Sequence, residues 1–362
     1  MSKKFFLIIY ILLFISTASA ADHGIYMRVV KNIKGDYTKV CASVKQSLRS
    51  AGFKILADHD ITTPDKVKED RKDLCGYRGK LFVFTNEDYI KAITSFGNKY
   101  LSAGFLRVGI HETNEGIQII IADPETIDRI IFNDLNDDLY NKAVKKIVPF
   151  KTKIIDAIHS LNLGSNVKEV REPKRSDEDI RDASKDMIMM VGDMTFFEDE
   201  DQFPEIYSQK KNVTVEGLEK LKQNILANIK NFSPNQEDKE YRWSENLKED
   251  LKWKVISEAY SPDKKAILLG LTRNQTEGVS FYIVGDETKE NSCPGLDHLT
   301  AYPIEVLLMI KGDKIVVNTP REMFRMDMYF WDAGMKAFMD HMSMPDILDE
   351  SIYRALFAKD KD

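Results

Sequence analysis

The sequence has few of the residues that carry most enzymatic and metal chemistry. Its 362 residues include three cysteines and six histidines. No C-x-x-C, H-E-x-x-H, G-x-G-x-x-G or G-x-S-x-G pattern occurs, nor does the glycine–lysine pattern of a P-loop. These absences exclude the standard signatures of zinc sites, nucleotide sites and serine hydrolases. We therefore identify no catalytic residue and expect a role other than catalysis.

An excess of positive charge is also missing. The chain has 52 Lys and Arg against 58 Asp and Glu, which gives a net charge of -6. A mildly acidic protein has no electrostatic attraction for nucleic acid or for an anionic membrane, so we expect neither as a partner. With 43% apolar and 30% charged residues, the composition is that of a folded globular protein.

Long hydrophobic runs are absent outside the N-terminus. Residues 1–20 contain two lysines, an apolar run from Phe5 to Ile15 and the small residues Ala18-Ser19-Ala20. This order is typical of a secretory signal peptide, here cleaved between Ala20 and Ala21. The run is shorter than the about 20 helical residues that cross a bilayer, although an uncleaved anchor is the alternative. We expect a soluble protein that is exported to the periplasm.

Export determines how the cysteines are interpreted. Cys41 and Cys75 lie in the first half of the chain, and Cys293 lies in the second. An oxidising compartment permits a disulfide between Cys41 and Cys75, which would leave Cys293 free or paired between chains. Such a bridge would stabilise the fold by roughly 3–4 kcal/mol through closure of its loop. Three unpaired thiols are the alternative.

Two segments of the chain share an apolar pattern. Ile25-Tyr26 recurs as Ile206-Tyr207, and a helix is expected after each pair. Both helices have apolar residues at every fourth position, which predicts one buried face. These residues are Val40, Val44 and Leu48 in the first segment and Leu221, Ile225 and Ile229 in the second. The first helix is expected to end at Gly52, and strands are expected around residues 53–57 and 253–259.

The later parts of the two segments also match. LFVFTNE (81–87) resembles FYIVGDE (281–287), and residues 104–124 resemble residues 302–320. Each member of the second pair has an apolar run, a polar turn with glycine, another apolar run and a proline. That pattern predicts a β-hairpin. Because the matching blocks occur in the same order, we infer a tandem duplication.

The duplication predicts the fold class and the domains. Strands and helices fall in separate runs, so we expect an α+β fold of two tandem repeats, each an antiparallel sheet with helices packed on one face. Residues 163–195 carry both signs of charge and are expected to be a linker or a solvated helix. The chain then divides into a signal peptide (1–20), a first copy (21–162), this linker and a second, more divergent copy (196–362). One fused, pseudo-symmetric domain is the alternative.

The same residues resemble the bacterial family catalogued as domain of unknown function 302. The resemblance rests on Phe84-Thr85-Asn86-Glu87, Phe105-Leu106-Arg107-Val108 and Asp123-Pro124 in the first copy. In the second copy it rests on Val284-Gly285-Asp286-Glu287, Tyr302-Pro303-Ile304-Glu305-Val306 and Thr319-Pro320. The resemblance implies a TATA-box-binding-protein-like α+β fold, and the family includes tandem forms. Neither copy has the intact F-G-N-P of the family, and the resemblance implies no catalytic residue.

Copper is the metal cofactor that the sequence suggests. Cleavage after Ala20 would leave Ala21-Asp22-His23, whose amine, backbone nitrogens and imidazole form the square-planar set that Cu(II) prefers. His341-Met342 adds ligand types that suit Cu(I). The methionines around this pair are expected to be core, because the repeat aligns them with apolar residues. They are Met323, Met326, Met328, Met335, Met339 and Met344.

Histidine gives two further candidates. Cys293 and His298 would form a nucleophile and base if a loop brought them together, which defines a thiol-dependent enzyme as the weaker alternative function. His111-Glu112 is expected in a solvated turn of the first hairpin. The leading expectation is a non-enzymatic binding or accessory protein for an unknown small ligand or partner protein, since duplication builds clefts between copies. A periplasmic copper- or silver-binding protein is the alternative.

Overall fold

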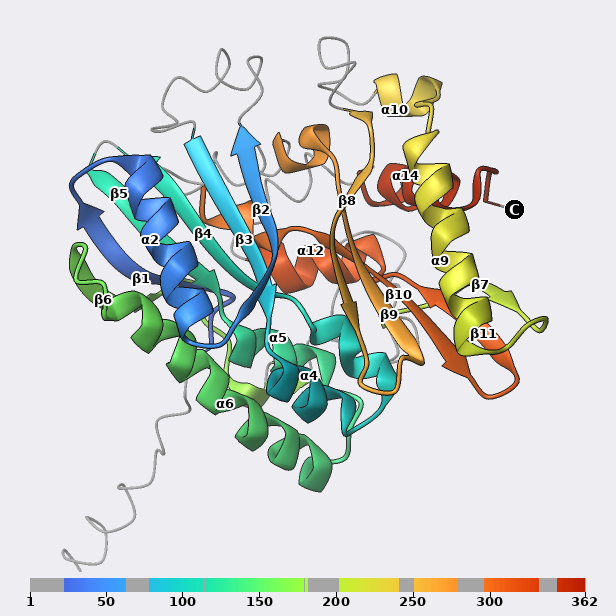
Figure 1. Cartoon of the computed structure of the whole chain (residues 1–362), viewed down its shortest axis with the longest axis horizontal. Coiled ribbons are helices and arrows are strands. Elements are labelled where there is room, and N and C mark those ends of the chain that lie inside the picture. Colours follow the sequence, from blue (N-terminus) through green and yellow to red (C-terminus); the bar gives the residue numbers. More distant parts are fainter. Residues whose placement is uncertain are drawn as a thin grey trace, which may run out of the picture.

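Two antiparallel sheets lie side by side in the computed structural model, which describes residues 23–62, 78–113, 115–178, 180–181, 202–240, 251–278, 296–331 and 344–361 (Figure 1). The strand order is β2-β3-β4-β5-β1-β6 in sheet one and β7-β11-β10-β9-β8 in sheet two. Sheet one consists of β1 (Tyr26–Ile33), β2 (Lys54–Thr62), β3 (Arg78–Thr85), β4 (Leu106–Thr113), β5 (Gly116–Ala122) and β6 (Ser165–Val170). Sheet two consists of β7 (Glu205–Gln209), β8 (Lys254–Tyr260), β9 (Ala266–Thr272), β10 (Ile304–Lys311) and β11 (Lys314–Asn318). The expected α+β class is confirmed.

Five strands follow one another in the same order in both sheets. The first strand of each copy pairs with the last, so that β1-β5-β4-β3-β2 corresponds to β7-β11-β10-β9-β8. The two hairpins share one register, because Thr113 pairs with Gly116 and Lys311 pairs with Lys314 across turns of equal length. Counting back from these turns makes Gly109 equivalent to Leu307 and Arg107 equivalent to Glu305.

The helix after the first strand has the same design in both copies. In α2 (Tyr37–Ser50) the Asp36 side chain caps the N-terminus by accepting from the Lys39 amide at 2.8 Å, and Thr214 caps α9 (Val215–Lys230) in the same way. Gly52 follows α2 with φ of +80°, a conformation that glycine adopts readily. The apolar positions expected from the sequence, Val40, Val44, Leu48, Leu221, Ile225 and Ile229, are all buried.

The expected match between residues 81–87 and 281–287 is wrong. The counterpart of β3 is β9, since β9 pairs with β8 and β10 as β3 pairs with β2 and β4. Residues 281–287 lie outside the described residues. The sequence misled us because alternating apolar residues recur in any half-buried strand, and because only five residues separate β8 from β9 in this copy.

Part of the expected linker is a strand. Residues 165–170 form β6, which pairs antiparallel with β1 at the edge of sheet one. Its side chains are exposed or half-buried, which is why its polar composition suggested a linker. An edge strand needs only backbone hydrogen bonds on one side and tolerates charged side chains. Arg171, directly after β6, forms an ion pair with Asp297 of the second copy at 2.6 Å.

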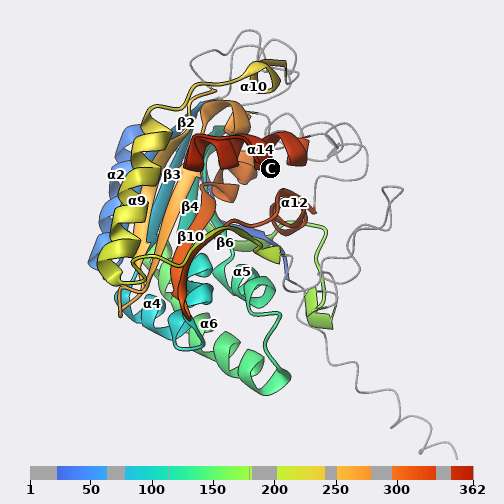
Figure 2. The same cartoon turned by 90° about the vertical axis from the view of Figure 1, so that its right-hand side faces the viewer.

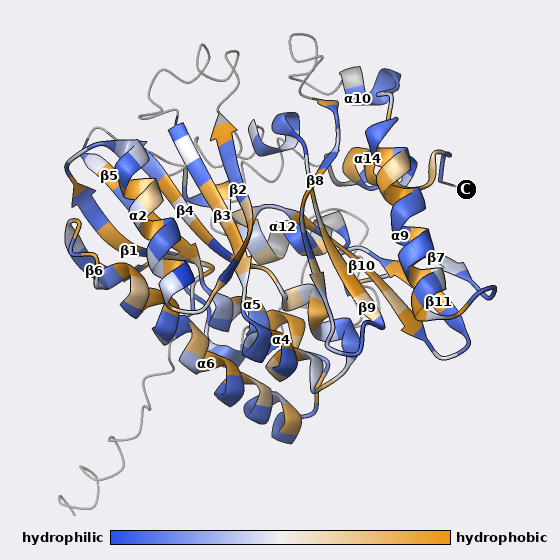
Figure 3. Ribbon diagram, in the orientation of Figure 1, coloured by the Kyte–Doolittle hydropathy of each residue, from blue (hydrophilic) through white to orange (hydrophobic). Residues whose placement is uncertain are grey.

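Helices cover both faces of the pair of sheets. Figure 2 shows α2 and α9 on one face and the remaining long helices on the other. The other helices are α4 (Glu87–Thr94), α5 (Pro124–Ile131), α6 (Asp137–His159), α10 (Gln236–Glu240), α12 (Glu322–Phe330) and α14 (Met344–Phe357). Apolar residues line the strands and the inner sides of the helices (Figure 3). Among the described residues, no helix is long and apolar enough to span a membrane.

The two copies exchange a short helical segment. The 3₁₀ helix η1 (Asn98–Ala103) belongs to copy one but packs on β9 and β10 of sheet two. Its equivalent η3 (Leu296–Ala301) belongs to copy two but packs on β3, β4 and β5 of sheet one. The strands β2 and β8 are also in contact, and His59 is hydrogen-bonded to Glu277 at 2.7 Å. One continuous hydrophobic core therefore spans both copies.

Candidate functional site: a cavity between the two copies

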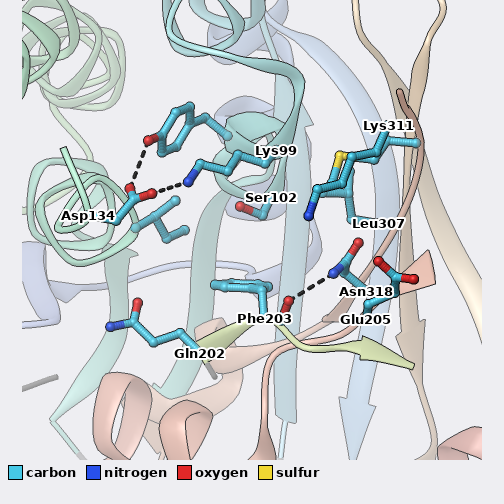
Figure 4. Close-up of a pocket in the computed structure, with 12 residues that line it drawn as sticks. Lys99, Ser102, Asp134, Gln202, Phe203, Glu205, Leu307, Lys311 and Asn318 are labelled. Carbon is cyan, nitrogen blue, oxygen red and sulfur yellow. Dashed lines mark hydrogen bonds and ion pairs between the residues drawn. The ribbon is translucent and has the colours of Figure 1, made fainter. Parts of the chain in front are cut away.

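A cavity of about 490 Å³ lies where η1 of copy one faces sheet two (Figure 4). Copy one contributes η1, the end of α5 and the residues that follow it, and copy two contributes β7, β10 and β11. The lining residues are Lys99, Tyr100, Ser102, Ile131, Asp134, Gln202, Phe203, Glu205, Leu307, Met309, Lys311 and Asn318. Because both copies supply walls, the duplication itself builds the cavity.

Buried polar and apolar side chains alternate on the inner wall of the cavity. Ser102 and Asn318 are 4% and 7% exposed, and Leu307 and Met309 lie beside them on β10. The Asn318 amide donates to the Phe203 carbonyl at 2.8 Å, while its Oδ1 accepts no hydrogen bond from a described residue. A buried amide oxygen without a donor is costly, so a group that donates to it would be held well.

Charged side chains surround the mouth of the cavity. Lys99 forms an ion pair with Asp134, and the Tyr100 hydroxyl donates to the same carboxylate at 2.7 Å. Lys314 holds Glu205 at 2.6 Å, and although burial raises the pKa of Glu205, the Lys314 hydrogen bond brings it below its usual value. These two carboxylates are therefore neutralised by neighbouring ammonium groups.

Lys311 differs from these residues. Its side chain extends from the end of β10 into the cavity (Figure 4). Among the described residues no hydrogen bond or ion pair holds its ammonium group, although its charge contributes to lowering the pKa of Glu205. The cavity thus offers one ammonium group that is not already paired within the described part of the chain.

The equivalent place under η3 is filled by a cluster of polar side chains. Asp297 stands where copy one has Lys99, and His111 stands where copy two has Met309. Asp297 Oδ2 lies 2.6 Å from Arg171 Nη1 and 3.6 Å from Arg28 Nη2, and Asp297 Oδ1 lies 3.9 Å from His111 Nε2. Burial raises the pKa of Asp297, but Arg171, His111 and Arg28 bring it to about 2. Burial lowers the pKa of His111 to about 4, so the imidazole is neutral near pH 7.

Gly109 explains why the copies pack so closely under η3. A Cβ atom at this position would lie 2.5 Å from Leu299 Cδ1 and 2.8 Å from Thr300 Cγ2, both in η3. Only glycine lets η3 approach β4 to this distance. The equivalent residue in sheet two is Leu307, whose side chain lines the cavity under η1. The two interfaces therefore differ, because η3 packs directly on a glycine of β4 while the cavity under η1 lies beside a leucine of β10.

His111 is not in the solvated turn that the sequence led us to expect. It is 1% exposed on β4, beneath η3. Arg107, Gly109 and His111 alternate along β4, so all three face the second copy. That alternation was the available signal, but it gave no reason to place a second copy over this face.

His298 is likewise fully buried, with its ring against Tyr26 and stacked on Phe330, while Cys293 lies outside the described residues.

The other candidates from the sequence are dispersed. Cys41 is buried on α2, where burial raises the pKa of its thiol to about 11, and Cys75 lies outside the described residues. The Cys41–Cys75 disulfide therefore stays a prediction. Met328 is fully buried, as expected of a core methionine.

The copper candidates are not brought together by the described part of the chain. His23 is buried, and its backbone nitrogen donates to the Arg175 carbonyl at 2.8 Å. Coordination of Cu(II) by that nitrogen would require loss of this hydrogen bond. Ala21, Asp22, His341 and Met342 lie outside the described residues, and no group of three metal-ligating His, Cys, Asp or Glu side chains occurs within them. Copper binding stays a prediction, tested by counting the copper that the mature protein retains after desalting.

Comparison with known proteins gives a likeness to solved structures and none by sequence. No family model matches the chain, and no curated protein matches it. Among solved structures, the chain is similar to one described as an uncharacterized conserved protein DUF302 from Bacillus stearothermophilus. The two are 13% identical with a TM-score of 0.29, over 37% of this chain and 98% of that chain.

Proposed function

We propose that this protein is a non-enzymatic, exported protein that binds a small ligand in the cavity between its two copies. Removal of the N-terminal signal sequence would release it into the periplasm. We also propose that each copy belongs to the domain of unknown function 302 family, on the motifs given above. The cavity carries the proposal, because both copies supply its lining and it is large enough for a small molecule.

The size and lining of the cavity support ligand binding. Ligand pockets typically enclose about 300–1,000 Å³ and combine apolar walls with a few polar groups, and this cavity of about 490 Å³ does both. Leu307 and Met309 supply apolar surface, while Ser102, Asn318 and Lys311 supply a hydroxyl, an amide and an ammonium group. Clefts between domains are also where ligands are most often bound.

The same lining gives no support for catalysis. Among the lining residues, Ser102 carries the hydroxyl group best suited to act as a nucleophile. No described histidine lines the cavity to activate it. Lys99 and Asp134 neutralise each other instead of being held apart as an acid and a base. General acid–base or nucleophilic chemistry needs a base within hydrogen-bond reach of the group that it activates.

Native mass spectrometry of the exported protein tests the proposal. Protein isolated from the periplasm is expected to carry an additional mass that disappears under denaturing conditions. The Ser102→Leu variant places a larger side chain in the cavity and is expected to lose that mass. The Ser160→Leu variant is the matched control, because Ser160 is exposed at the end of α6 and does not line the cavity. Absence of any released compound from the wild-type protein would contradict the proposal.

A further inference from the structure

We infer that the ligand is a small organic anion, bound once per chain, with its charged group on Lys311 and its apolar body on Leu307 and Met309. This inference rests on the proposed function and adds the chemical class and the stoichiometry of the ligand. Three independent features of the described residues lead to it: the balance of charge at the cavity, the apolar surface on β10 and the asymmetry between the two interfaces.

The balance of charge at the cavity is positive. Asp134 is neutralised by Lys99 and by the Tyr100 hydroxyl, and Glu205 is neutralised by Lys314. Lys311 remains as a cation that no described side chain pairs. An anionic group that reached its ammonium would form a charge-assisted hydrogen bond, which is roughly twice as strong as a neutral one. A cationic ligand would instead be repelled.

The apolar surface lies next to this cation on the same strand. Leu307, Met309 and Lys311 alternate along β10, so their side chains project from one face of the sheet into the cavity. Phe203 and Ile131 add further apolar surface to the lining. A ligand with an anionic end and an apolar body would therefore match the order of side chains along the strand.

The second interface is unable to hold the same ligand. Under η3, the equivalents of Lys99 and Met309 are Asp297 and His111, and both are buried within the cluster that includes Arg171. Asp297 brings no cation to the position where Lys99 stands in the open cavity, and its carboxylate is already held by Arg171 at 2.6 Å. Leu299 and Thr300 pack directly on Gly109, where the cavity has Leu307. We therefore expect one ligand per chain despite the duplication.

Calorimetric titration with three matched probes tests the inference. The full mature protein, unfolded and refolded to remove bound compounds, is titrated with phenylacetate, 2-phenylethanol and 2-phenylethylamine, which differ in the charge of the end group. Phenylacetate is expected to bind more tightly than the alcohol, with one site per chain, and the amine is expected to bind least. Lys311→Met is expected to weaken phenylacetate binding by about tenfold and to leave the alcohol unchanged.

The Lys220→Met variant is the control for the loss of one positive charge. Lys220 is exposed on α9, on the face of sheet two opposite the cavity, so its removal is expected to leave the affinity unchanged. Equal affinities for the alcohol and phenylacetate, or equal effects of the two lysine variants, would overturn the inference that the ligand is an anion. Either result would leave the proposed function intact. Two sites per chain would overturn the stoichiometry.

If none of the three probes binds, the inference is tested by the charge of the compound that is released from the periplasmic protein under denaturing conditions. An anionic compound whose mass is lost in Lys311→Met would support the inference. A neutral or cationic compound would overturn the inference alone. Release of no compound at all would overturn the proposed function together with it.

Discussion

Arg107 on β4 and Glu305 on β10 occupy the same position in the two copies and meet as a buried ion pair. Both side chains are 1% exposed. Arg107 also donates to the Tyr302 carbonyl at 3.0 Å, and the Tyr329 hydroxyl donates to Glu305 at 2.8 Å. In a dimer of identical copies this position would face itself, with two arginines or two glutamates in contact. Because this position is an arginine in copy one and a glutamate in copy two, the pairing of copy one with copy two is favoured over the pairing of identical copies.

Removal of one partner of this pair is expected to destabilise the protein strongly. Arg107→Met leaves the Glu305 carboxylate buried without its cation, and such a loss costs about 3–5 kcal/mol. The exchanged double variant, Arg107→Glu with Glu305→Arg, is expected to recover part of that loss, because it restores one cation and one anion at the two buried positions. Urea unfolding measures the free energies. A double variant no more stable than the single variants would contradict the equivalence of the two positions.

The close contact of η3 with β4 gives a second expectation. Gly109→Ala adds a Cβ atom at 2.5 Å from Leu299 Cδ1, so η3 must move, and overpacking of this kind costs about 1–3 kcal/mol. Gly79→Ala is the control on the neighbouring strand, where the nearest atom, the Ile61 carbonyl oxygen, would lie at 3.3 Å. Thermal unfolding is expected to show the larger loss for Gly109→Ala. Similar losses for both variants would argue against the tight packing of η3.

The buried imidazole of His111 makes stability depend on pH. Its folded pKa of about 4 is below the value of 6.5 for an exposed histidine. The unfolded chain therefore binds a proton first as the pH falls, and stability is lost between those two values. The loss from this residue is about 2 kcal/mol between about pH 7 and pH 5. Asp297, with a folded pKa of about 2, adds a further loss only at lower pH.

The His111→Met variant isolates this contribution. Methionine is the residue that copy two has at the equivalent position, Met309, and it does not titrate. Free energies of unfolding from urea titrations at several pH values are expected to fall less steeply below about pH 6.5 in the variant than in the wild type. Parallel curves for the two proteins would show that His111 is not buried in its neutral form.

The continuous core implies that the two copies unfold together. All three tryptophans, Trp243, Trp253 and Trp331, belong to the second copy, so fluorescence reports mainly on that copy, with Trp331 also in contact with Pro173 and Arg175. Far-UV circular dichroism reports on both copies. The two signals are expected to change at the same urea concentration, as one cooperative transition. Separate midpoints would show that η1, η3 and the buried ion pair do not couple the copies.

Much of the fold was accessible from the sequence because it depends on local patterns. The spacing of Val40, Val44 and Leu48 predicted one buried helix face, and the glycine-containing turns at Gly116 and Gly312 predicted the hairpins. Gly52 marked the end of the first helix. The exchange of η1 and η3 could not be predicted from the sequence. The spacing of apolar residues does not indicate which of the two sheets a short helical segment packs on.

The cavity and the polar cluster followed from that exchange, and so they were missed. Lys99 and Lys311 look like ordinary surface lysines in the sequence, and Asn318 looks like the end of a strand. His111 appeared to continue a polar turn because Glu112 and Thr113 follow it. Only the packing of the second copy on β4 turns Arg107 and His111 inward, and that contact joins residues far apart in the chain.

A crystal structure of the mature protein isolated from the periplasm tests the central claim most directly. We expect density for one organic molecule in the cavity between η1 and β10, with a polar group within hydrogen-bond distance of Lys311 Nζ. We expect no such density between η3 and β4, where Leu299 packs on Gly109. A cavity that holds only ordered water, in protein that has never been unfolded, would contradict the account.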